Sequence, residues 1–459
     1  MNFSEIKQVY CLGIGGAGVS GLARLLKAQG KQVSGSDVAE TAITKALRAE
    51  GIVVAVPQAA SNVPAKADLF VYSDAVPADN IERQAIRSLR LNQKKCTYFH
   101  ALGEFMSLFH QRIAVSGTHG KTTTTAMLTL VLEAAGLDPT ALIGSTVPVL
   151  NSNIRTSANN EYCVIEACEH NAHMLELCPN AIVLTNIEAD HLDYYRNLAH
   201  IQDTFQTYVN KLPTNGVFVQ NIDDPGSAMI HYSGKTITYG LNRRAHIRAH
   251  TILKYKNVQH FTVNGTTYEL NVPGDFNVYN ALAVISYATA IGVTPDKIYE
   301  GLKRFTGTAR RFEVVGTYHD ALVISDYAHH PTAIRNLLKA TKERYPQQRI
   351  VMVFQPHQHN RTLKLFDQFI DAFHNVDILI IQEIFDVVGR EEQSDQAISS
   401  NDLVQAIPSS EQQVFYSAKH INTKQLLAEQ VRANDIVLIV GAGDIYTIAE
   451  ELCLTNYQQ

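Results

Sequence analysis

A lysine followed by threonines, directly after a short glycine-containing turn, is the strongest chemical signal in this 459-residue chain. Residues 116–125 read SGTHGKTTTT and follow the apolar run RIAV, so the order is strand, turn, lysine, helix. In a phosphate-binding loop such a lysine reaches the β- and γ-phosphates, and the hydroxyl after it binds Mg²⁺. Val115 stands where the usual GxxxxGKT pattern has its first glycine, and two spacer residues are missing.

We expect this loop to bind ATP, because a hydroxyl that holds Mg²⁺ would have no use with a metal-free cofactor. The alternative is a glycine- and threonine-rich cap on an ordinary helix. The residues predicted to contact ATP here are Gly117, Thr118, His119, Gly120, Lys121, Thr122 and Thr123.

Acidic residues at the ends of two later apolar runs are candidates for further metal ligands. Glu166 ends YCVIE, and Asp190 and His191 follow AIVLTN within TNIEADHLD. Carboxylates suit Mg²⁺, whereas histidine is a less usual ligand for it. From the residues alone, His191 is either a hydrogen-bonding partner or a ligand, and Glu169 is either a competing carboxylate or a solvated side chain.

A second glycine loop lies about a hundred residues earlier, in GIGGAGVSG. Gly13, Gly15 and Gly18 form GxGxxG between a predicted strand and a predicted helix, and Asp37 ends the next strand. This placement favours a nucleotide diphosphate, with its pyrophosphate at the helix N-terminus and a ribose hydroxyl at the acidic residue. The motif does not distinguish NAD from another nucleotide diphosphate, and glycines that serve only the turn are the alternative.

The elements that must position these loops fall into three blocks of alternating strands and helices, at about 1–108, 109–307 and 308–459. Alternation of this kind implies parallel sheets with crossover helices in every block, although residues 216–270 are richer in strands. Parallel sheets bind ligands at the carboxyl ends of their strands, where both glycine loops and the acidic residues are predicted to lie.

The composition is that of an ordinary globular protein. A net charge of −5 argues against non-specific binding to nucleic acid or to a membrane surface. No apolar run approaches the roughly 18 residues of a membrane helix, and the N-terminus has no signal-peptide core, so we expect a soluble cytoplasmic protein. The six cysteines form no CxxC pair, which favours buried free thiols.

Eight motifs, in order, make the chain resemble the Mur ligases, the ATP-dependent ligases that add amino acids in peptidoglycan synthesis. They are GIGGAGVSGLA, GTHGKTTT, TNIEADH, NVYNALA, RRFE, DYAHHPTAI, QPHQHNRT and GAGDI. The resemblance covers nearly the whole chain. It implies an α/β fold of three domains: a Rossmann-like UDP-sugar domain (1–108), a central P-loop ATP domain with a mostly parallel sheet (109–307) and a Rossmann-like amino-acid domain (308–459).

The resemblance also implies the reaction and its residues. The cofactors would be ATP and Mg²⁺, and the partners UDP-N-acetylmuramic acid and a small amino acid, L-alanine, joined through an acyl phosphate. The implied catalytic residues are Lys121, Glu166, His191, Arg311 and Asp326, and the implied metal ligands are Thr122, Glu166 and His191. Further ATP contacts would be Asn277, Asn280, Arg311 and Asp326.

Two more groups of contacts follow from the same resemblance. The UDP-sugar would meet Gly13, Gly15, Gly16, Ala17, Gly18, Asp37 and Ser73. The amino acid would meet Tyr327, His329, His357 and Arg361, whose alternative role is to satisfy loop backbone at strand ends.

Four departures from the family pattern are visible. Cys168 replaces an acidic residue in EACEH, Gln358 replaces an arginine in QPHQHNRT, and Asp74 replaces a serine in YSDAV. The run EIFDVVGRE stands in place of DIYPAGE. Because the amino-acid side is altered, we expect a weaker KM for L-alanine, or a preference for glycine or L-serine.

Three other functions remain open at this stage. One is the related ligase that attaches a recycled peptide to UDP-N-acetylmuramic acid, which suits DYAHHPTAI but lacks the usual EPRSNT run. A second is a nicotinamide-dependent oxidoreductase, which rests on the first loop alone and has no evident hydride-transfer site. A third is a non-catalytic nucleotide-binding regulator, against which Lys121, Glu166, His191 and Asp326 argue.

Overall fold

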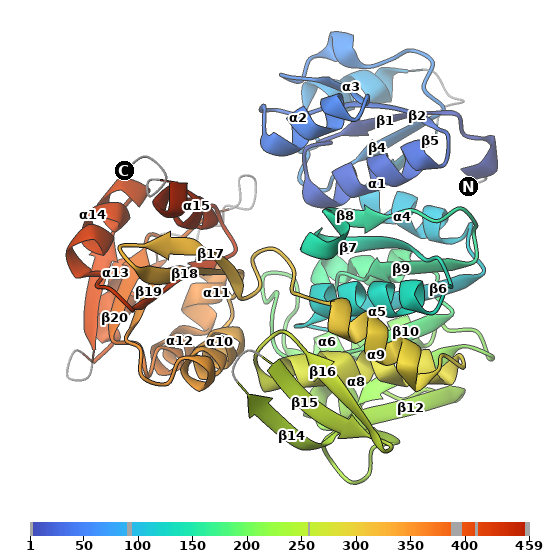
Figure 1. Ribbon diagram of the computed structural model, residues 1–459. Coiled ribbons are helices and arrows are strands. Elements are labelled where there is room, and N and C mark those ends of the chain that lie inside the picture. Colours follow the sequence, from blue (N-terminus) through green and yellow to red (C-terminus); the bar gives the residue numbers. More distant parts are fainter. Residues whose placement is uncertain (1–2, 90–93, 256–257, 387–396, 409–411, 455–459) are drawn as a thin grey trace. The chain divides into compact units, whose positions relative to one another are not determined.

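The computed structural model describes residues 3–89, 94–255, 258–386, 397–408 and 412–454 (Figure 1). The chain divides into two compact units. The first comprises Met1–Asn186, Gln202–Ile247 and Ala283–Gly301, and the second comprises Ile187–Ile201, Arg248–Leu282 and Leu302–Gln459.

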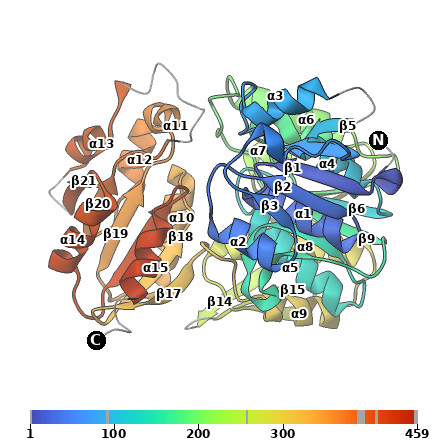
Figure 2. The ribbon, with the colours of Figure 1, turned by 90° about the horizontal axis from the view of Figure 1, so that it is seen from above.

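The first unit begins with a five-stranded sheet in which all neighbouring strands are parallel. Its strands, in spatial order, are β3 (Val53–Ala55), β2 (Gln32–Ser36), β1 (Gln8–Leu12), β4 (Leu69–Tyr72) and β5 (Lys94–Thr97). Its helical elements are η1 (Phe3–Glu5), α1 (Ala17–Ala28), α2 (Ala42–Ala49), η2 (Ala60–Asn62), α3 (Ile81–Ser88) and α4 (Tyr98–Met106). Figure 2 shows β1, β2 and β3 side by side. The strand order reverses between β1 and β4, and ligands bind beside such a switch point.

An eight-stranded sheet follows, with β6 between β10 and β9. Its strands, in spatial order, are β13 (Ile247–Arg248), β12 (Lys235–Gly240), β11 (Val217–Asn221), β10 (Ala181–Leu184), β6 (Gln111–Ser116), β9 (Tyr162–Glu166), β7 (Thr140–Val147) and β8 (Ser152–Arg155). The helical elements along this part of the chain are α5 (Lys121–Ala134), η3 (Pro148–Leu150), η4 (His170–Glu176), α6 (Leu198–Val209), α7 (Pro225–Ala228), α8 (Asp275–Ala290) and α9 (Pro295–Arg304). The pairing of β6 with β9 and β10 is parallel, so their carboxyl ends lie at one edge.

The second unit holds a small antiparallel sheet and a six-stranded sheet. The small sheet consists of β14 (His250–Tyr255), β15 (Val258–Val263) and β16 (Thr266–Leu270). The larger sheet runs β17 (Glu313–Tyr318), β18 (Ala321–Asp326), β22 (Ile436–Gly441), β19 (Ile350–Gln355), β20 (Ile378–Gln382) and β21 (Gln413–Ser417). Its helices are α10 (Pro331–Arg344), α11 (His359–Lys364), α12 (Phe366–Ala372), α13 (Ser400–Ala406), α14 (His420–Gln430) and α15 (Tyr446–Leu454).

The core of the six-stranded sheet explains why its strands read as continuous apolar runs. In β19, Met352 and Phe354 join one buried cluster with α10 and α12, while Val351 and Val353 join another with α14 and α15. Side chains alternate between the faces of a strand, so a strand covered by helices on both sides is apolar at every position.

The predicted fold class is confirmed, with local corrections. Strand β17 pairs antiparallel with β18, β8 pairs antiparallel with β7, and the strand-rich region contains the antiparallel sheet β14–β16 rather than a crossover unit. The run RTLKLFDQFIDAF forms two short helices, α11 and α12, separated at Leu365. The three domain boundaries stay predictions.

Two predictions from composition can also be compared with the structure. All six cysteines are free, and Cys11, Cys96 and Cys163 are buried. Among the residues that the structure describes, no helix is both long enough and apolar enough to cross a membrane.

Candidate active site

The lysine-containing loop follows β6 and is fixed by the end of the neighbouring strand β10. Gly117 has φ +136°, and a Cβ there would lie 2.1 Å from Thr185 Oγ1, so only glycine fits. Thr118 N and His119 N donate to the backbone oxygen and side-chain oxygen of Asn186, at 2.9 and 2.8 Å. These two amides are therefore occupied, and the unpaired N–H groups that begin α5 are the ones available to a phosphate.

Lys121 opens α5 after Gly120, which has φ +82°. Its Nζ donates to Gly117 O at 2.6 Å and to Thr118 O at 3.1 Å, and it lies 2.8 Å from Glu169 Oε2. Burial alone would lower the pKa of Lys121, but the carboxylates of Glu169 and Glu166 outweigh it and raise that pKa. The loop thus holds a permanent cation. Glu169 is 3% exposed, so its alternative as a solvated side chain is wrong.

Thr122 and Glu166 converge as an oxygen pair beside this lysine. Thr122 Oγ1 donates to Glu166 Oε2 at 2.8 Å, and Gly144 N donates to the same oxygen at 3.0 Å. A Cβ on Gly144 would lie 2.3 Å from that oxygen and 2.8 Å from Thr122 Oγ1. A hydroxyl and a carboxylate held side by side are the hard oxygen donors that Mg²⁺ takes, so these residues fit the predicted metal, and only a glycine at position 144 fits against them.

The other glycine loop lies at the switch point between β1 and β4. Gly13 has φ +70°, and a Cβ there would lie 3.3 Å from Ser73 Cβ, so the two strand ends touch. Gly15 N donates to Asp37 Oδ2 at 2.7 Å, and Val38 N donates to Asp37 Oδ1 at 2.8 Å. Asp37 therefore shapes the loop through the backbone. The remaining members of the predicted set are Gly16, which caps α1, and Ala17 and Gly18 in its first turn.

His191 lies in the second unit, on the segment Ile187–Ile201, so its predicted convergence with Thr122 and Glu166 stays a prediction. Its backbone has φ +51°, and its N–H donates to Asp190 Oδ1 at 2.7 Å. Arg361 Nε and Nη2 each lie 2.9 Å from the same oxygen. Burial would raise the pKa of Asp190, but the Arg361 guanidinium holds it well below its usual range. The ion pair between Arg361 and Asp190 thus fixes the turn that carries His191.

The four predicted amino-acid contacts lie together in the second unit. The His329 ring lies 5.2 Å from the Tyr327 ring and 6.0 Å from the His357 ring, and Arg361 Nη1 contacts His357 O at 3.1 Å. Burial, and then the nearby Arg361 charge, lowers the pKa of His329 well below its ordinary value, so this imidazole is neutral.

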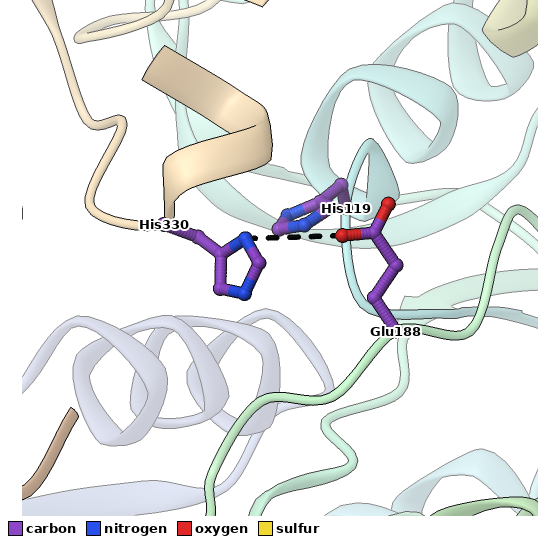
Figure 3. Close-up of side chains that lie close together, drawn as sticks. All are labelled: His119, Glu188 and His330. Atoms are coloured by element: carbon purple, nitrogen blue, oxygen red, sulfur yellow. Dashed lines mark ion pairs between the residues drawn. The ribbon is translucent and has the colours of Figure 1, made fainter. Parts of the chain in front are cut away.

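The N-terminus of α10 also contacts the segment around Asp190 and His191. Figure 3 shows His330 and Glu188 facing one another, with His330 Nδ1 3.8 Å from Glu188 Oε2. His330 Nε2 contacts Ala189 O at 3.2 Å, and Lys364 donates to Leu192 O at 2.7 Å. Residues 188–192 are therefore tied to α10 and α11 at several points.

Asp326, Arg311 and Arg310 meet where β18 ends. Asp326 accepts N–H groups of Phe312 and Ala328, both at 2.7 Å, and burial raises its pKa against the opposing effect of Arg311. The Arg311 guanidinium lies 4.7 Å from the centre of the Tyr327 ring. Arg310 Nη2 donates to Gly441 O at 2.9 Å and Gly443 O at 3.0 Å, which fixes the GAGDI turn.

The two predicted asparagines lie at the start of α8. Asn280 Nδ2 donates to Asn277 Oδ1 at 3.1 Å, and Asn277 Nδ2 donates to Pro273 O at 2.7 Å. Both are 5% exposed. They form a joined pair, and their contact with ATP stays a prediction.

The departures from the family pattern have different consequences. Burial, and then Glu169, raises the pKa of Cys168 to about 12, so a neutral thiol replaces a carboxylate there. Gln358 caps α11 with φ +69°. The run EIFDVVGRE begins at Glu383, and its residues 387–391 lie outside the described residues.

Several residues that position the site were not predicted from the sequence. Gly144, Asn186 and Arg310 act through hydrogen bonds that involve the backbone, and the spacing of residues in the sequence does not signal such bonds. Asp190 was visible as an acidic residue at a strand end, but its pairing with Arg361 joins positions 171 residues apart.

Fold and site together define a nucleotide-binding α/β protein with a glycine loop on each of two sheets, one of them carrying a P-loop lysine. Three families match in chain order: "Mur ligase family, catalytic domain" at residues 8–110, "Mur ligase middle domain" at 115–288 and "Mur ligase, glutamate ligase domain" at 310–443. The chain belongs to the Mur ligase family.

Similar proteins span the full length of the chain. UDP-N-acetylmuramate–L-alanine ligases from Clostridium novyi and Clostridium tetani are 38% and 39% identical, covering 97% and 96% of this chain and 96% of each relative. The crystal structure of a UDP-N-acetylmuramate–alanine ligase from Thermotoga maritima has TM-score 0.82 and 28% identity, over 99% of both chains. A murein peptide ligase from Psychrobacter arcticus has TM-score 0.73 and 25% identity, over 98% of both chains.

Proposed function

We propose that this chain is an ATP-dependent ligase that joins L-alanine to UDP-N-acetylmuramic acid. In this proposal residues 1–108 bind the UDP-sugar, 109–307 bind ATP and 308–459 bind the amino acid. The observation that carries the proposal is the Lys121–Glu169 ion pair next to the Thr122–Glu166 oxygen pair, a phosphoryl-transfer site in a chain whose full-length relatives are named L-alanine ligases.

The first step is phosphoryl transfer. The lactyl carboxylate of the muramic acid attacks the γ-phosphorus of ATP, an acyl phosphate forms and ADP leaves. Such transfer depends on positioning and on neutralising charge. Lys121 supplies the charge, and its contacts with Gly117 O and Thr118 O hold its ammonium at the loop. Glu169 keeps that ammonium in place until phosphate oxygens take over as its partners.

Thr122 and Glu166 would hold Mg²⁺, with His191 as a third proposed ligand. When bound, the ion neutralises phosphate charge and orients the phosphates. Gly144 contributes its N–H to Glu166 Oε2, and its lack of a side chain allows the carboxylate to lie there.

The second step is acyl transfer. The amine of L-alanine attacks the acyl carbon, the bond to the phosphate oxygen breaks and inorganic phosphate leaves. The amine must be neutral to attack, and we propose that the neutral His329 lies beside it, next to His357, as an uncharged contact. Asp326 and Arg311 would contact ATP, as would Asn277 and Asn280. Arg361 would contribute to the carboxylate site with Asp190 as its fixed partner.

One assay tests the proposal. ADP release is followed with UDP-N-acetylmuramic acid and a panel of L-alanine, glycine, L-serine and the peptide L-alanyl-γ-D-glutamyl-meso-diaminopimelate. The expected result is release that requires the UDP-sugar and is fastest with L-alanine or another small amino acid. Release with the peptide alone would instead support a murein peptide ligase. Membership of this family leaves the hypothesis of a nicotinamide-dependent oxidoreductase without support. We expect no turnover of NAD(H) in the same preparation, and measurable turnover would revive that hypothesis.

A further inference from the structure

Two side chains of the first unit connect the region of the substrate loop with the turn beside the ATP loop. Asp74 follows β4, and His173 lies within η4. Asp74 Oδ2 lies 3.2 Å from His173 Nε2, and the two side chains are 32% and 16% exposed. We propose that Asp74 and His173 are positioning residues that set the UDP-sugar loop and the ATP loop at their reacting separation. The proposal rests on the proposed function.

On one side the contacts run from Asp74 to the first glycine loop. Ser73 precedes Asp74, and its N–H donates to Leu12 O at 3.2 Å. Its Cβ would touch a Cβ on Gly13 at 3.3 Å, and its Oγ accepts the N–H of Ala75 at 3.3 Å. A shift of Asp74 would therefore also move Ser73, the residue against which Gly13 of the substrate loop packs.

On the other side the contacts run from His173 to Lys121. The backbone turns sharply at Asn171 and Ala172, with φ +52° and +57°, and Ala172 N donates to Glu169 O at 2.9 Å. Glu169 is the carboxylate that holds Lys121. Non-glycine residues adopt this conformation at a cost, which the surrounding contacts must offset.

The His173 ring is also held by an aromatic partner. Phe99 stacks on it with ring centres 3.9 Å apart and planes 11° from parallel. Phe99 follows Tyr98, against which Gly18 packs, since a Cβ on Gly18 would lie 2.8 Å from that ring. A surface ion pair by itself adds little to the stability of the fold. The stacking of Phe99 on the His173 ring, however, fixes the orientation in which that ring meets the Asp74 carboxylate. Gly13 packs against Ser73, the neighbour of Asp74, and Gly18 packs against Tyr98, the neighbour of Phe99, so each end of the substrate loop is linked to His173 through two residues.

In the proposed function the diphosphate of the UDP-sugar binds the first loop and ATP binds the second. The separation between the lactyl carboxylate and the γ-phosphate therefore depends on what joins those loops. A misplacement of about 1 Å can lower a rate by about 100-fold while each ligand still binds its own loop. Loss of the pair should therefore lower kcat by about 10- to 100-fold and leave the KM for ATP and for UDP-N-acetylmuramic acid within about threefold.

A double-mutant cycle tests this with Asp74→Ser, His173→Ser and the double variant, each characterised by kcat, both KM values and Tm. We expect each single variant to lose kcat to the extent just given, and the double variant to lose no more than the worse single one. Asp74→Asn keeps the shape of the side chain and replaces Asp74→Ser if that variant does not fold. His100→Ser is the matched control, because His100 also contacts η4 through a carboxylate, Glu176 at 3.0 Å, whereas within the described part of the chain its side chain makes no bond to the loop after β4.

Three results would overturn the proposal: single variants with kcat within about twofold of wild type, additive losses in the double variant, or an equal loss in His100→Ser. The wild-type rate with L-alanine in the same assay reports on the proposed function separately, since the cycle uses only ratios to that rate.

Discussion

The two glycine loops of the first unit begin alike and are built differently. Each follows a parallel strand and opens a helix, yet the first is shaped by a carboxylate, Asp37, which accepts the N–H of Gly15. The second is shaped by amide contacts to Asn186 and encloses the ammonium of Lys121. Beside the second loop, Thr122 and Glu166 add an oxygen pair, whereas the predicted contacts of the first loop include no lysine or arginine.

This difference teaches that a glycine pattern alone does not state the chemistry. A diphosphate that stays intact needs only backbone N–H groups and room, which glycines provide. A phosphate that is transferred needs a fixed charge at the place where charge develops. The first loop is therefore suited to hold a substrate and the second to carry out the reaction.

The largest effect should come from removing the charge of the second loop. Lys121→Ala should lower kcat by about 10²- to 10³-fold, the scale of losing one preorganised charge-stabilising group. The variant should still fold, but its Tm should fall because the buried Glu169 loses the cation that pairs with it. Lys297→Ala is the control, since that lysine is 50% exposed and its ion-pair partner is Glu300, three residues further along the same helix. A folded Lys121→Ala enzyme with near-wild-type kcat would rule out the phosphate role.

A somewhat smaller effect is expected from placing a side chain at Gly144, against Thr122 and Glu166. Gly144→Ala puts a methyl 2.3 Å from the Glu166 carboxylate, which must move off the Thr122 hydroxyl. We expect kcat to fall by about 10-fold or more and half-saturation to require more Mg²⁺, as for loss of one placed group. Gly136→Ala is the comparison variant, because its Cβ meets nothing within 4 Å, although its φ of +74° will lower Tm. Equal kcat in both variants would contradict a metal site at this position.

The first loop should respond in affinity rather than in rate. Gly15→Val places carbon 2.8 Å from the Asp37 carboxylate and closes the approach to a diphosphate. The KM for UDP-N-acetylmuramic acid should rise while the KM for ATP stays nearly unchanged. Calorimetry on the wild-type protein adds the ligand test: tight binding of NAD(H) with none of the UDP-sugar would reverse the assignment of this loop.

The smallest effects concern a third anion, the amino-acid carboxylate. Arg361→Lys should raise the amino-acid KM and spare ATP binding, since lysine cannot reproduce a forked guanidinium that contacts Asp190 and His357 together. Gln358→Arg should tighten L-alanine binding by about 1–2 kcal/mol, the scale of one charge-assisted hydrogen bond. An unchanged amino-acid KM in Arg361→Lys would place the carboxylate elsewhere.

Much of the fold could be predicted because its signals are local. Apolar runs gave the buried strands, and the residue types after each run marked the ligand edge, so Gly117, Glu166 and Asp326 lie at strand ends as expected. Antiparallel β17 and the sheet β14–β16 escaped because a strand's direction depends on its partner and not on its own residues.

The site was predictable in its chemistry and not in its partnerships. Lys121 and Thr122 are predicted by a motif. The motif does not predict that Lys121 pairs with Glu169 rather than with solvent, because this depends on how η4 folds back toward α5. Arg361 was predicted to bind the carboxylate of the amino acid. In the structure it pairs with the carboxylate of Asp190, 171 residues away in the chain. Pairings between distant segments are set by packing, which spacing along one sequence does not encode.

Transfer of isotope from the sugar to phosphate tests the central claim most directly. The enzyme is supplied with ATP, L-alanine and UDP-N-acetylmuramic acid whose lactyl carboxylate carries oxygen-18, and the released inorganic phosphate is examined by mass spectrometry. The carboxylate oxygen that attacks the γ-phosphorus leaves with the phosphate when the amine displaces it. The account predicts phosphate containing one labelled oxygen, in an amount equal to the ADP formed. Unlabelled phosphate would contradict it, because ATP would then be cleaved without reaction at the substrate carboxylate.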